Sequence, residues 1–415
     1  MCGILGVVHL EELSTDGVSL KFPEDLQRSM IENALSFTDS DQKKLASILN
    51  TTRGTIFDFK TSRFGSSSLW FVFKLSTFLA SKGFEEFSIL KLEKKIDAIK
   101  TEWVGKSILN PKFPIDFNNK YGAKIIAAIM CDGGLTSCKY PFYVNKNEKL
   151  VDGVIKSVEE VVGKIEYNRR TYDNIIEAGF PKILGCILTK VGIVPGKKIL
   201  TNYPIPPFII DNPNIYRDFL QQAFDDEGYV NVGDKKGGGK RITLTQYNYW
   251  KRKPRRLLQI KGILNFLGVR SSGPYFQISH TAKNGNKTYG YFLQISNQSD
   301  LSVFAEKIGF TIDYKIGNLQ KLLDSYVSRP RLKNGTISNR ILEEINKLKE
   351  EKSEITIQNI SNKLGKNESW IAEVIRNMIK ERKLRVIKLK LRIKGCSNGF
   401  SRKQFDLYPQ RDVET

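Results

Sequence analysis

The sequence contains no run of 18 or more apolar residues, so we expect no membrane-spanning helix. Its N-terminus lacks a basic segment followed by a clean apolar stretch, which argues against a secretory signal. The five cysteines are scattered without a CxxC pair, and only two histidines, His9 and His280, are present. This scarcity argues against a structural zinc site and a disulfide framework. We therefore expect a reduced, intracellular protein, which is cytoplasmic if the cell has no nucleus.

Acidic residues are also scarce relative to basic ones. The 415 residues include 66 Lys and Arg against 44 Asp and Glu, which gives a net charge of +22. Such a surplus favours a polyanionic partner, either nucleic acid or an anionic membrane surface, over a generally basic soluble protein. The bases are clustered, because residues 229–290 hold thirteen Lys or Arg and a single acid, Asp234. This clustering favours nucleic acid, and membrane binding is the least favoured interpretation.

Residues 1–116 have a helical pattern that predicts an all-α N-terminal domain. Residues 41–49 and 54–60 fit two short helices joined by a turn with capping residues. The pair is typical of a helix-turn-helix, in which Thr52 and Arg53 would face DNA. A small helical bundle is the alternative. The expected core positions are Leu45, Ala46, Ile48, Leu49, Ile56 and Phe57.

Residues 336–410 predict a separate C-terminal domain after a basic linker that contains proline and glycine. Three amphipathic helices (338–352, 355–364 and 367–382) precede two strands (384–393 and 404–408), which is the order of a winged helix. Trp370 and Arg376 would lie on its recognition helix, with Lys388, Lys390 and Arg392 on the wing. A helical protein-interaction module is the alternative.

Two similar stretches, residues 125–133 (IIAAIMCDG) and 220–228 (LQQAFDDEG), carry the candidate chemistry. Each is an apolar helical run with small residues that ends in a carboxylate and a glycine. Two such helices can pack side by side and bring Asp132 and Glu227 together. A carboxylate is unfavourable at a helix C-terminus, which indicates a functional role. Paired carboxylates need a neutralising cation, and Mg²⁺ is the natural choice beside a phosphodiester.

The two stretches resemble the motif that names the LAGLIDADG homing endonucleases. The resemblance implies an α+β fold, in which a pseudo-symmetric pair of αββαββα repeats forms a saddle of antiparallel sheets over the DNA major groove. The repeats would cover residues 117–212 and 213–328. Gln222 departs from the glycine that the family often has at that position, which affects how closely the two motif helices can pack.

The same resemblance implies the roles of the site residues. Asp132 and Glu227 would each hold Mg²⁺, one for each DNA strand, and a metal-bound water would attack phosphorus. Lys146 occupies the place of a supporting basic residue in the first half, whereas Asn297 stands at that place in the second half. Lys146 is equally well explained as a solvated surface lysine.

The basic segment would form the DNA-facing strands of the second repeat. Residues expected to read base edges are Arg241, Gln246 and Asn248, and those expected at phosphates are Lys251, Arg252, Lys253, Arg255 and Arg256.

The sequence thus predicts a monomeric, site-specific endonuclease that binds double-stranded DNA and cleaves it with Mg²⁺. The alternative is a weakly active or inactive DNA-binding transcriptional regulator on the same scaffold, which Gln222, Met130 and the missing second lysine favour. An RNA-processing or splicing factor is a third interpretation.

Overall fold

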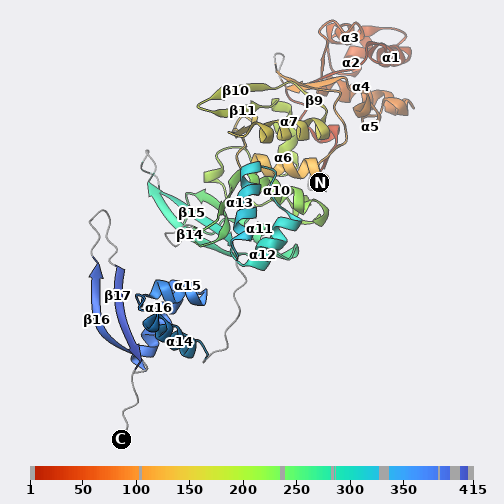
Figure 1. Cartoon of the computed structure of the whole chain (residues 1–415). Coiled ribbons are helices and arrows are strands. Elements are labelled where there is room, and N and C mark those ends of the chain that lie inside the picture. Colours follow the sequence, from red (N-terminus) through yellow and green to blue (C-terminus); the bar gives the residue numbers. More distant parts are fainter. Residues whose placement is uncertain are drawn as a thin grey trace. The chain divides into compact units, whose positions relative to one another are not determined.

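In the computed structural model, both carboxylate motifs form helices. The first is α6 (Lys120–Met130) and the second is α10 (Tyr216–Glu227), and the two pack against each other (Figure 1). The side chain of Asn119 begins α6 by accepting hydrogen bonds from main-chain N–H groups of its first turn. Small buried side chains on both helices, including Ala127 and Ala223, leave room for close approach.

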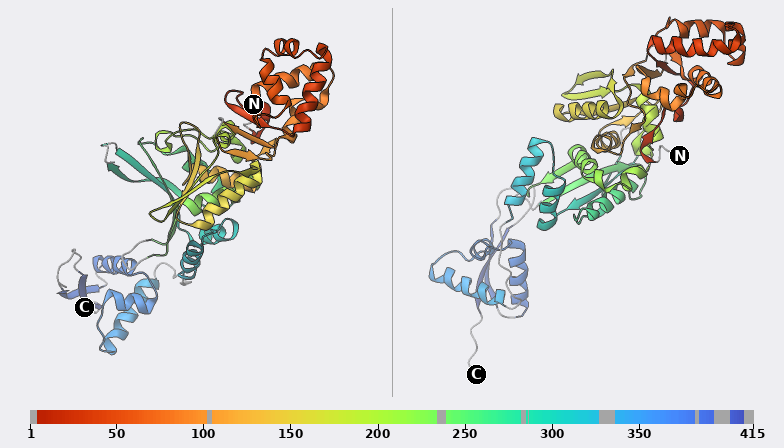
Figure 2. Two further views of the ribbon diagram at one scale, coloured as in Figure 1. Left: turned by 90° about the horizontal axis from the view of Figure 1, so that it is seen from above. Right: turned by 90° about the vertical axis from the view of Figure 1, so that its right-hand side faces the viewer.

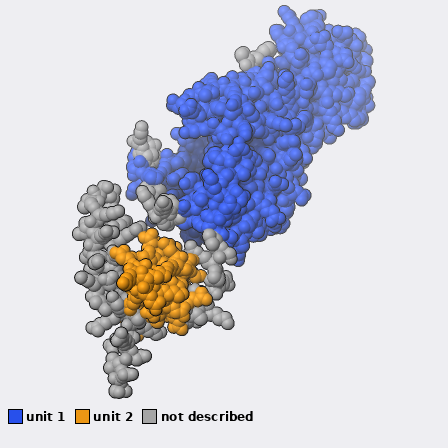
Figure 3. All heavy atoms as spheres, in the orientation of Figure 1, with its two compact units in different colours: residues 1–326 blue, residues 327–415 orange. Residues whose placement is uncertain are grey.

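The chain forms two compact units, Met1–Tyr326 and Val327–Thr415 (Figure 3). The structure describes residues 5–101, 105–233, 239–281, 285, 287–326, 336–381, 384–392 and 402–409. Within these residues, no helix is long and apolar enough to cross a membrane.

The same order of elements follows each motif helix. After α6 come β7 (Gly134–Leu135), β8 (Pro141–Asn145), α7 (Glu148–Val162), β9 (Lys164–Ile165), β10 (Asn168–Tyr172), β11 (Ile175–Gly179) and α8 (Lys182–Lys190). After α10 come β12 (Gly228–Asn231), β13 (Arg241–Asn248), α11 (Arg255–Phe266), β14 (Ser272–Thr281), β15 (Lys287–Ile295), α12 (Gln298–Lys307) and then α13 (Asp313–Asp324). Apart from β9, which pairs with β5 of the N-terminal region, both halves have the predicted α-β-β-α-β-β-α order.

The two antiparallel sheets also share one strand order. They run β7-β8-β11-β10 and β12-β13-β15-β14, so in each the fourth strand lies between the second and the third. Side chains alternate across each sheet, as the pleat of a strand requires. In β13, Ile242 and Leu244 are buried on one face, while Thr243 and Tyr247 lie on the other.

The N-terminal region is not all-α, which corrects the prediction. The structure forms the sheet β3-β2-β4-β5-β9, whose last strand, β9 (Lys164–Ile165), belongs to the first repeat. The alternation of buried Val18 and Leu20 with Ser19 and Lys21 is the strand pattern that the sequence reading missed. The strands are β1 (Val7–Val8), β2 (Val18–Lys21), β3 (Ser67–Ser68), β4 (Ala98–Thr101), β5 (Ser107–Leu109) and β6 (Ile115–Asp116).

Helices of this region lie at the end of unit 1 that is away from the second repeat (Figure 2). They are α1 (Glu24–Leu35), α2 (Gln42–Ile48), α3 (Arg53–Lys60), α4 (Leu69–Ser81) and α5 (Ile89–Leu92). The short helices of unit 1 are η2 (Leu10–Glu12), η3 (Ser36–Thr38), η4 (Glu85–Phe87), η5 (Glu93–Lys95), η6 (Lys198–Leu200), α9 (Pro207–Ile210) and η7 (Pro213–Ile215).

The predicted pair of short helices is present as α2 and α3. Thr52 begins α3 by accepting a hydrogen bond from the main-chain N–H of Thr55, and the Arg53 Nε donates to Gln42 Oε1 at 3.3 Å. Four of the six expected core residues are buried, but Ile48 and Phe57 are 49% and 47% exposed. They lie on the outer faces of their helices. A DNA contact by Thr52 and Arg53 remains a prediction.

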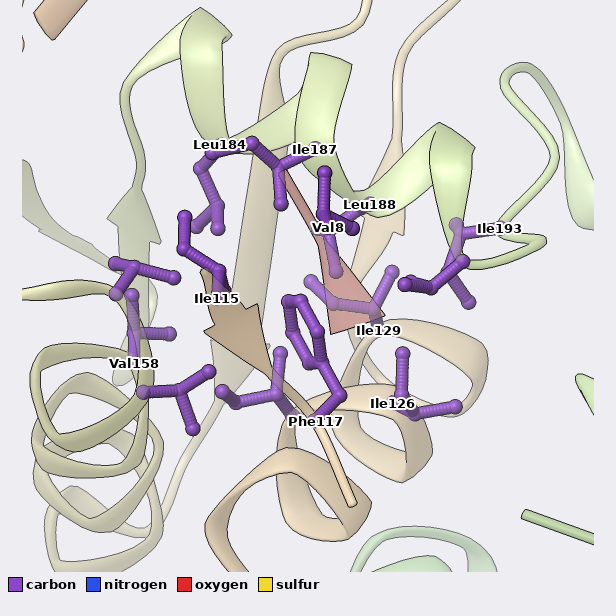
Figure 4. Packing of buried hydrophobic residues seen from close by; sticks show 14 of the residues in the cluster. Val8, Ile115, Phe117, Ile126, Ile129, Val158, Leu184, Ile187, Leu188 and Ile193 are labelled. Carbon is purple, nitrogen blue, oxygen red and sulfur yellow. The ribbon is translucent and has the colours of Figure 1, made fainter. Parts of the chain in front are cut away.

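One apolar core joins the N-terminal strand pair to the first repeat. Figure 4 shows Val8 of β1 and Ile115 of β6 among side chains of α6, α7 and α8. The labelled residues around them are Phe117, Ile126, Ile129, Val158, Leu184, Ile187, Leu188 and Ile193. This shared core explains why the N-terminal region and both repeats form one unit.

The second unit has three helices followed by an antiparallel strand pair, as the sequence predicts. They are α14 (Thr336–Glu350), α15 (Ile357–Leu364), α16 (Glu368–Lys380), β16 (Leu384–Arg392) and β17 (Arg402–Pro409). Isoleucines from all three helices form a core of its own. Trp370 and Arg376 are exposed on α16. The side chains of Lys388, Lys390 and Arg392 lie outside what the structure describes.

Candidate metal and nucleic-acid site

The two motif carboxylates lie at the same end of the packed helices. Glu227 is the last residue of α10, and Asp132 follows the end of α6 by two residues. Burial raises the pKa of the Asp132 carboxyl, and the nearby charge of Glu227 raises it further. Lys198 and Lys315 act in the opposite direction. The fold therefore brings the carboxylates of Asp132 and Glu227 close enough for each charge to affect the other, with the cations of Lys198 and Lys315 nearby.

An arginine from α11 holds Glu227. The Arg256 Nη2 donates to both carboxylate oxygens of Glu227, at 2.9 and 2.8 Å. Its Nη1 donates to the carbonyl of Met130, and its Nε donates to Gln246 Oε1 at 3.3 Å. Burial is the largest effect and lowers the pKa of Arg256, but the negative groups around it, first among them Glu227, together outweigh burial and raise the pKa. Hydrogen bonds between an ionised guanidinium and an ionised carboxylate are among the stronger ones in proteins.

The predicted phosphate contact of Arg256 is corrected by this geometry. Only 6% of the residue is exposed, and its guanidinium faces the protein interior. Position 256 lies on the buried face of α11, one residue after exposed Arg255. Adjacent residues on a helix point about 100° apart, so two neighbouring arginines have different surroundings.

A lysine from another element binds the end of each motif helix. Lys198 in η6 donates to the carbonyls of Met130 and Cys131 at the end of α6. Lys315 in α13 donates to the carbonyls of Phe224, at 2.9 Å, and Asp225 at the end of α10. These ammonium groups bind carbonyls of the last turn of each helix, where partners within the helix run out, and they offset the negative end of each helix dipole. The sequence analysis missed both, because no local pattern links either lysine to its motif.

Asn145, and not Lys146, contacts Asp132. The Asn145 Nδ2 donates to Asp132 Oδ2 at 2.8 Å, whereas Lys146 is exposed. Asn145 ends β8 and shares a face with buried Tyr143, while Lys146 already lies in the turn before α7. In the second half, Asn297 caps α12 by accepting from the N–H of Ser299. Among the described residues, Lys146 makes no contact with Asp132. Its role as a supporting basic residue stays a proposal.

The alternation of side chains along β13 places the predicted base-reading residues on different faces of the sheet. Gln246 and Asn248 share the face of buried Ile242 and Leu244, so they point toward the helices. Asn248 is 2% exposed and donates to the carbonyl of Arg252 at 3.2 Å. The prediction that Gln246 and Asn248 read bases is therefore corrected.

The open face of this sheet carries other side chains. Tyr229 and Tyr247 are 65% and 44% exposed there, and Arg241 is half-buried on the same face. Four of the five predicted phosphate-binding residues are exposed after β13, namely Lys251, Arg252, Lys253 and Arg255.

A cavity of about 540 Å³ borders Glu227. Lys198, Tyr203, Gln246 and Arg256 are among the residues that line it. Burial raises the pKa of Tyr203 to about 12, so its hydroxyl is a donor at neutral pH. The cavity therefore places mainly hydrogen-bond donors and cations around one carboxylate.

The donor set fits a hard divalent ion at Asp132 better than at Glu227. Mg²⁺ is commonly bound through one or two carboxylates together with phosphate oxygens and waters. Only Oδ2 of Asp132 accepts a hydrogen bond within the described residues, which leaves Oδ1 for a metal. Both oxygens of Glu227 accept from Arg256. Across the described part of the chain, no group of three or more His, Cys, Asp or Glu is placed to hold a metal.

Comparison with known proteins identifies one part of the chain. Residues 214–309 match the model of the LAGLIDADG-like domain. This range runs from η7 to the end of α12, and it includes the second motif helix and its sheet. No curated protein matches the chain.

Several solved structures of the homing endonuclease I-DmoI are similar to part of the chain. One, in complex with DNA and Mn, is 17% identical, with a TM-score of 0.31, and the match covers 47% of this chain and 98% of that one. Another, in complex with DNA and Ca, is 18% identical over 49% and 99% of the two chains, with a TM-score of 0.30. A mesophilic variant is 18% identical over 49% and 99%, with a TM-score of 0.31.

Proposed function

We propose that this chain binds a specific site in double-stranded DNA and cleaves its phosphodiester bonds with a divalent metal ion, most naturally Mg²⁺. The observation that carries the proposal is the convergence of Asp132 and Glu227 at the ends of two packed motif helices. The match of residues 214–309 to the LAGLIDADG-like domain supports the same conclusion. Because both carboxylates come from one chain, a single copy would supply the complete pair, and the proposal is that the protein acts as a monomer.

Each group of side chains has a part in this reaction. Asp132 and Glu227 would hold the metal, which supplies a Lewis acid and an activated water when bound. Asn145 orients Asp132 through its hydrogen bond. Arg256 holds Glu227 and limits the repulsion between the two carboxylates until DNA and metal bind.

The DNA would lie on the open face of the second sheet. Arg241 and Tyr247 are on this face, and the cations of the segment after β13, including Lys251 and Arg255, would bind phosphates. Thr52 and Arg53 at the start of α3 would extend the contact along the duplex, and so would Trp370 on α16.

Arg376 is also exposed on α16, and it would bind a DNA phosphate. In this proposal the second unit binds DNA as a winged helix. The two repeats together form a saddle over the major groove.

A selection from random duplexes followed by a cleavage assay tests the proposal. The full chain is first used to recover the duplex that it binds most tightly, and this duplex is then incubated with the protein and Mg²⁺. We expect the native chain to cut both strands, and Asp132→Asn and Glu227→Gln each to lose cutting of at least one strand, with DNA affinity retained. Tight binding without cleavage in either Mg²⁺ or Mn²⁺ would contradict the catalytic part.

A transcriptional regulator is the second candidate, and the Arg256–Glu227 pair favours it. A cation fixed by the protein occupies both oxygens of one carboxylate, which a metal would otherwise need. Sequence-specific binding with no cleavage would support this function, and the DNA-facing surface would be the same.

A further inference from the structure

Gln222 and Asp226 form a polar pair on the buried side of α10. They are four residues apart and so lie on one face of the helix, and the Gln222 Nε2 donates to Asp226 Oδ1 at 2.9 Å. When the letters LAGLIDADG are set against residues 220–228, Gln222 stands at the first glycine and Asp226 at the second alanine. Both departures replace a very small side chain with a larger polar one, and the two side chains bond to each other.

The pair reaches across to the first repeat. The Tyr143 Oη on β8 donates to Asp226 Oδ1 at 2.6 Å, and Gln222 Nε2 lies 3.3 Å from the same hydroxyl. Tyr143 is fully buried. Asn145 lies two residues further along the strand, and its Nδ2 is 3.3 Å from Tyr143 Oη and 2.8 Å from Asp132 Oδ2. A hydrogen-bonded chain therefore runs from Gln222 to Asp132.

This series of hydrogen bonds would have a free-energy cost if its only role were structural. Asp226 Oδ2 is buried and has no hydrogen-bond partner among the described residues. A buried acceptor without a partner disfavours folding, and two apolar side chains of similar size would pack here without that cost. The acid at this position therefore points to a use beyond holding the repeats together.

We propose that Asp226 is a positioning residue for Asp132, acting through Tyr143 and Asn145; this rests on the function proposed above. Asp226 fixes the Tyr143 hydroxyl, and Tyr143 in turn limits where the Asn145 amide can lie. Asn145 then holds Oδ2 of Asp132 and leaves Oδ1 for the metal. We call the series Asp226, Tyr143 and Asn145 the relay. Glu227 is fixed separately by Arg256, so the relay supports only Asp132.

The relay predicts a defect confined to one DNA strand. Removing a group that orients a metal ligand typically costs about 10- to 100-fold in metal affinity or activity. The test uses the full chain, its selected duplex with each strand carrying a different label, and Mg²⁺. Asp132→Asn first shows which strand depends on Asp132. Tyr143→Phe and Asp226→Asn should then slow cutting of that strand by about 10-fold or more, and leave the other strand within about twofold of native.

Tyr216→Phe is the matched control. Tyr216 is also buried, and its hydroxyl donates to the carbonyl of Ile210, at the opposite end of α10 from Asp226. This variant loses a buried tyrosine hydrogen bond but should leave both strands cut at the native rates. Equal slowing of both strands by Tyr143→Phe would show a general structural effect and overturn the positioning role, and so would an unchanged rate on both.

Mn²⁺ binding, followed by electron paramagnetic resonance in the presence of an uncut duplex analogue, separates this proposal from the proposed function. If the native chain binds Mn²⁺ and Asp132→Asn does not, Tyr143→Phe should weaken binding by about 10-fold. Native affinity in Tyr143→Phe would overturn the positioning role alone. Equal Mn²⁺ binding by native and Asp132→Asn would overturn the metal role of Asp132, and the relay would then have nothing to position.

Discussion

The guanidinium of Arg256 holds both carboxylate oxygens of Glu227, at 2.9 and 2.8 Å, within the core of the second repeat. Arg256 also binds the carbonyl of Met130, at the end of the other motif helix. One side chain therefore ties the second carboxylate to the first repeat.

Arg256→Met should destabilise the protein by about 3–5 kcal/mol, because it leaves a buried carboxylate without its partner. Urea-induced unfolding of the full chain measures the change. Glu227→Gln combined with Arg256→Met should cost less than the sum of the two single changes, since the pair is already broken. Arg255→Met, one residue away and exposed, is the control and should stay within about 0.5 kcal/mol of native. Additive costs would contradict a direct pair.

Asp132→Asn should stabilise the protein at neutral pH when no metal is present. The pKa of Asp132 is raised on folding, so the folded state disfavours the ionised form. The native chain therefore loses stability as pH rises from the ordinary carboxyl pKa of about 4 to the raised value, and the neutral amide does not. The difference between variant and native should vanish below about pH 4 and be constant above the raised pKa. A native chain more stable than the variant at pH 7 would contradict this.

Lys198→Met should lower the free energy of unfolding by about 1–3 kcal/mol, because it leaves the main-chain carbonyl of Cys131 at the end of α6 without its donor. Thermal or urea unfolding checks the value. Lys197 is the adjacent lysine and is exposed, so Lys197→Met is a control of the same composition and should have little effect. Equal effects of the two substitutions would show that Lys198 acts only through net charge.

Arg255→Ala should weaken DNA binding broadly and reduce the slope of log affinity against log salt by about 0.9, as expected for one lost phosphate contact. Fluorescence anisotropy with the selected duplex, at several salt concentrations, measures the slope. Lys91→Ala removes an exposed cation from α5 in the N-terminal region and should leave it unchanged. An unaltered slope for Arg255→Ala would place this residue away from the DNA backbone.

Much of the fold could be predicted because its main patterns are local. The motif helices, the α-β-β-α-β-β-α order and the three helices of the second unit each follow from periodicity and capping within a short window. The sheet that joins β5 to β9 could not be predicted in this way, since Ile108 and Ile165 are paired across a long stretch of chain.

The site was harder to predict than the fold, because its contacts depend on which face of an element each residue occupies. Asn145 reaches Asp132 because it shares a strand face with Tyr143, while the neighbouring lysine at 146 lies in a turn. Arg256 and Lys198 come from elements far from the carboxylates in sequence. A basic residue in a basic segment looks like a DNA contact until the fold shows it to be buried.

In the proposed function, Asp132 and Glu227 serve one metal-dependent centre that cuts both DNA strands. Single-turnover cleavage of the selected duplex, with each strand followed separately, tests it most directly. We expect the native chain to cut both strands, Asp132→Asn and Glu227→Gln each to abolish cutting of at least one, and all three to bind the duplex equally well. Cutting of both strands at the native rate by either variant would contradict the claim.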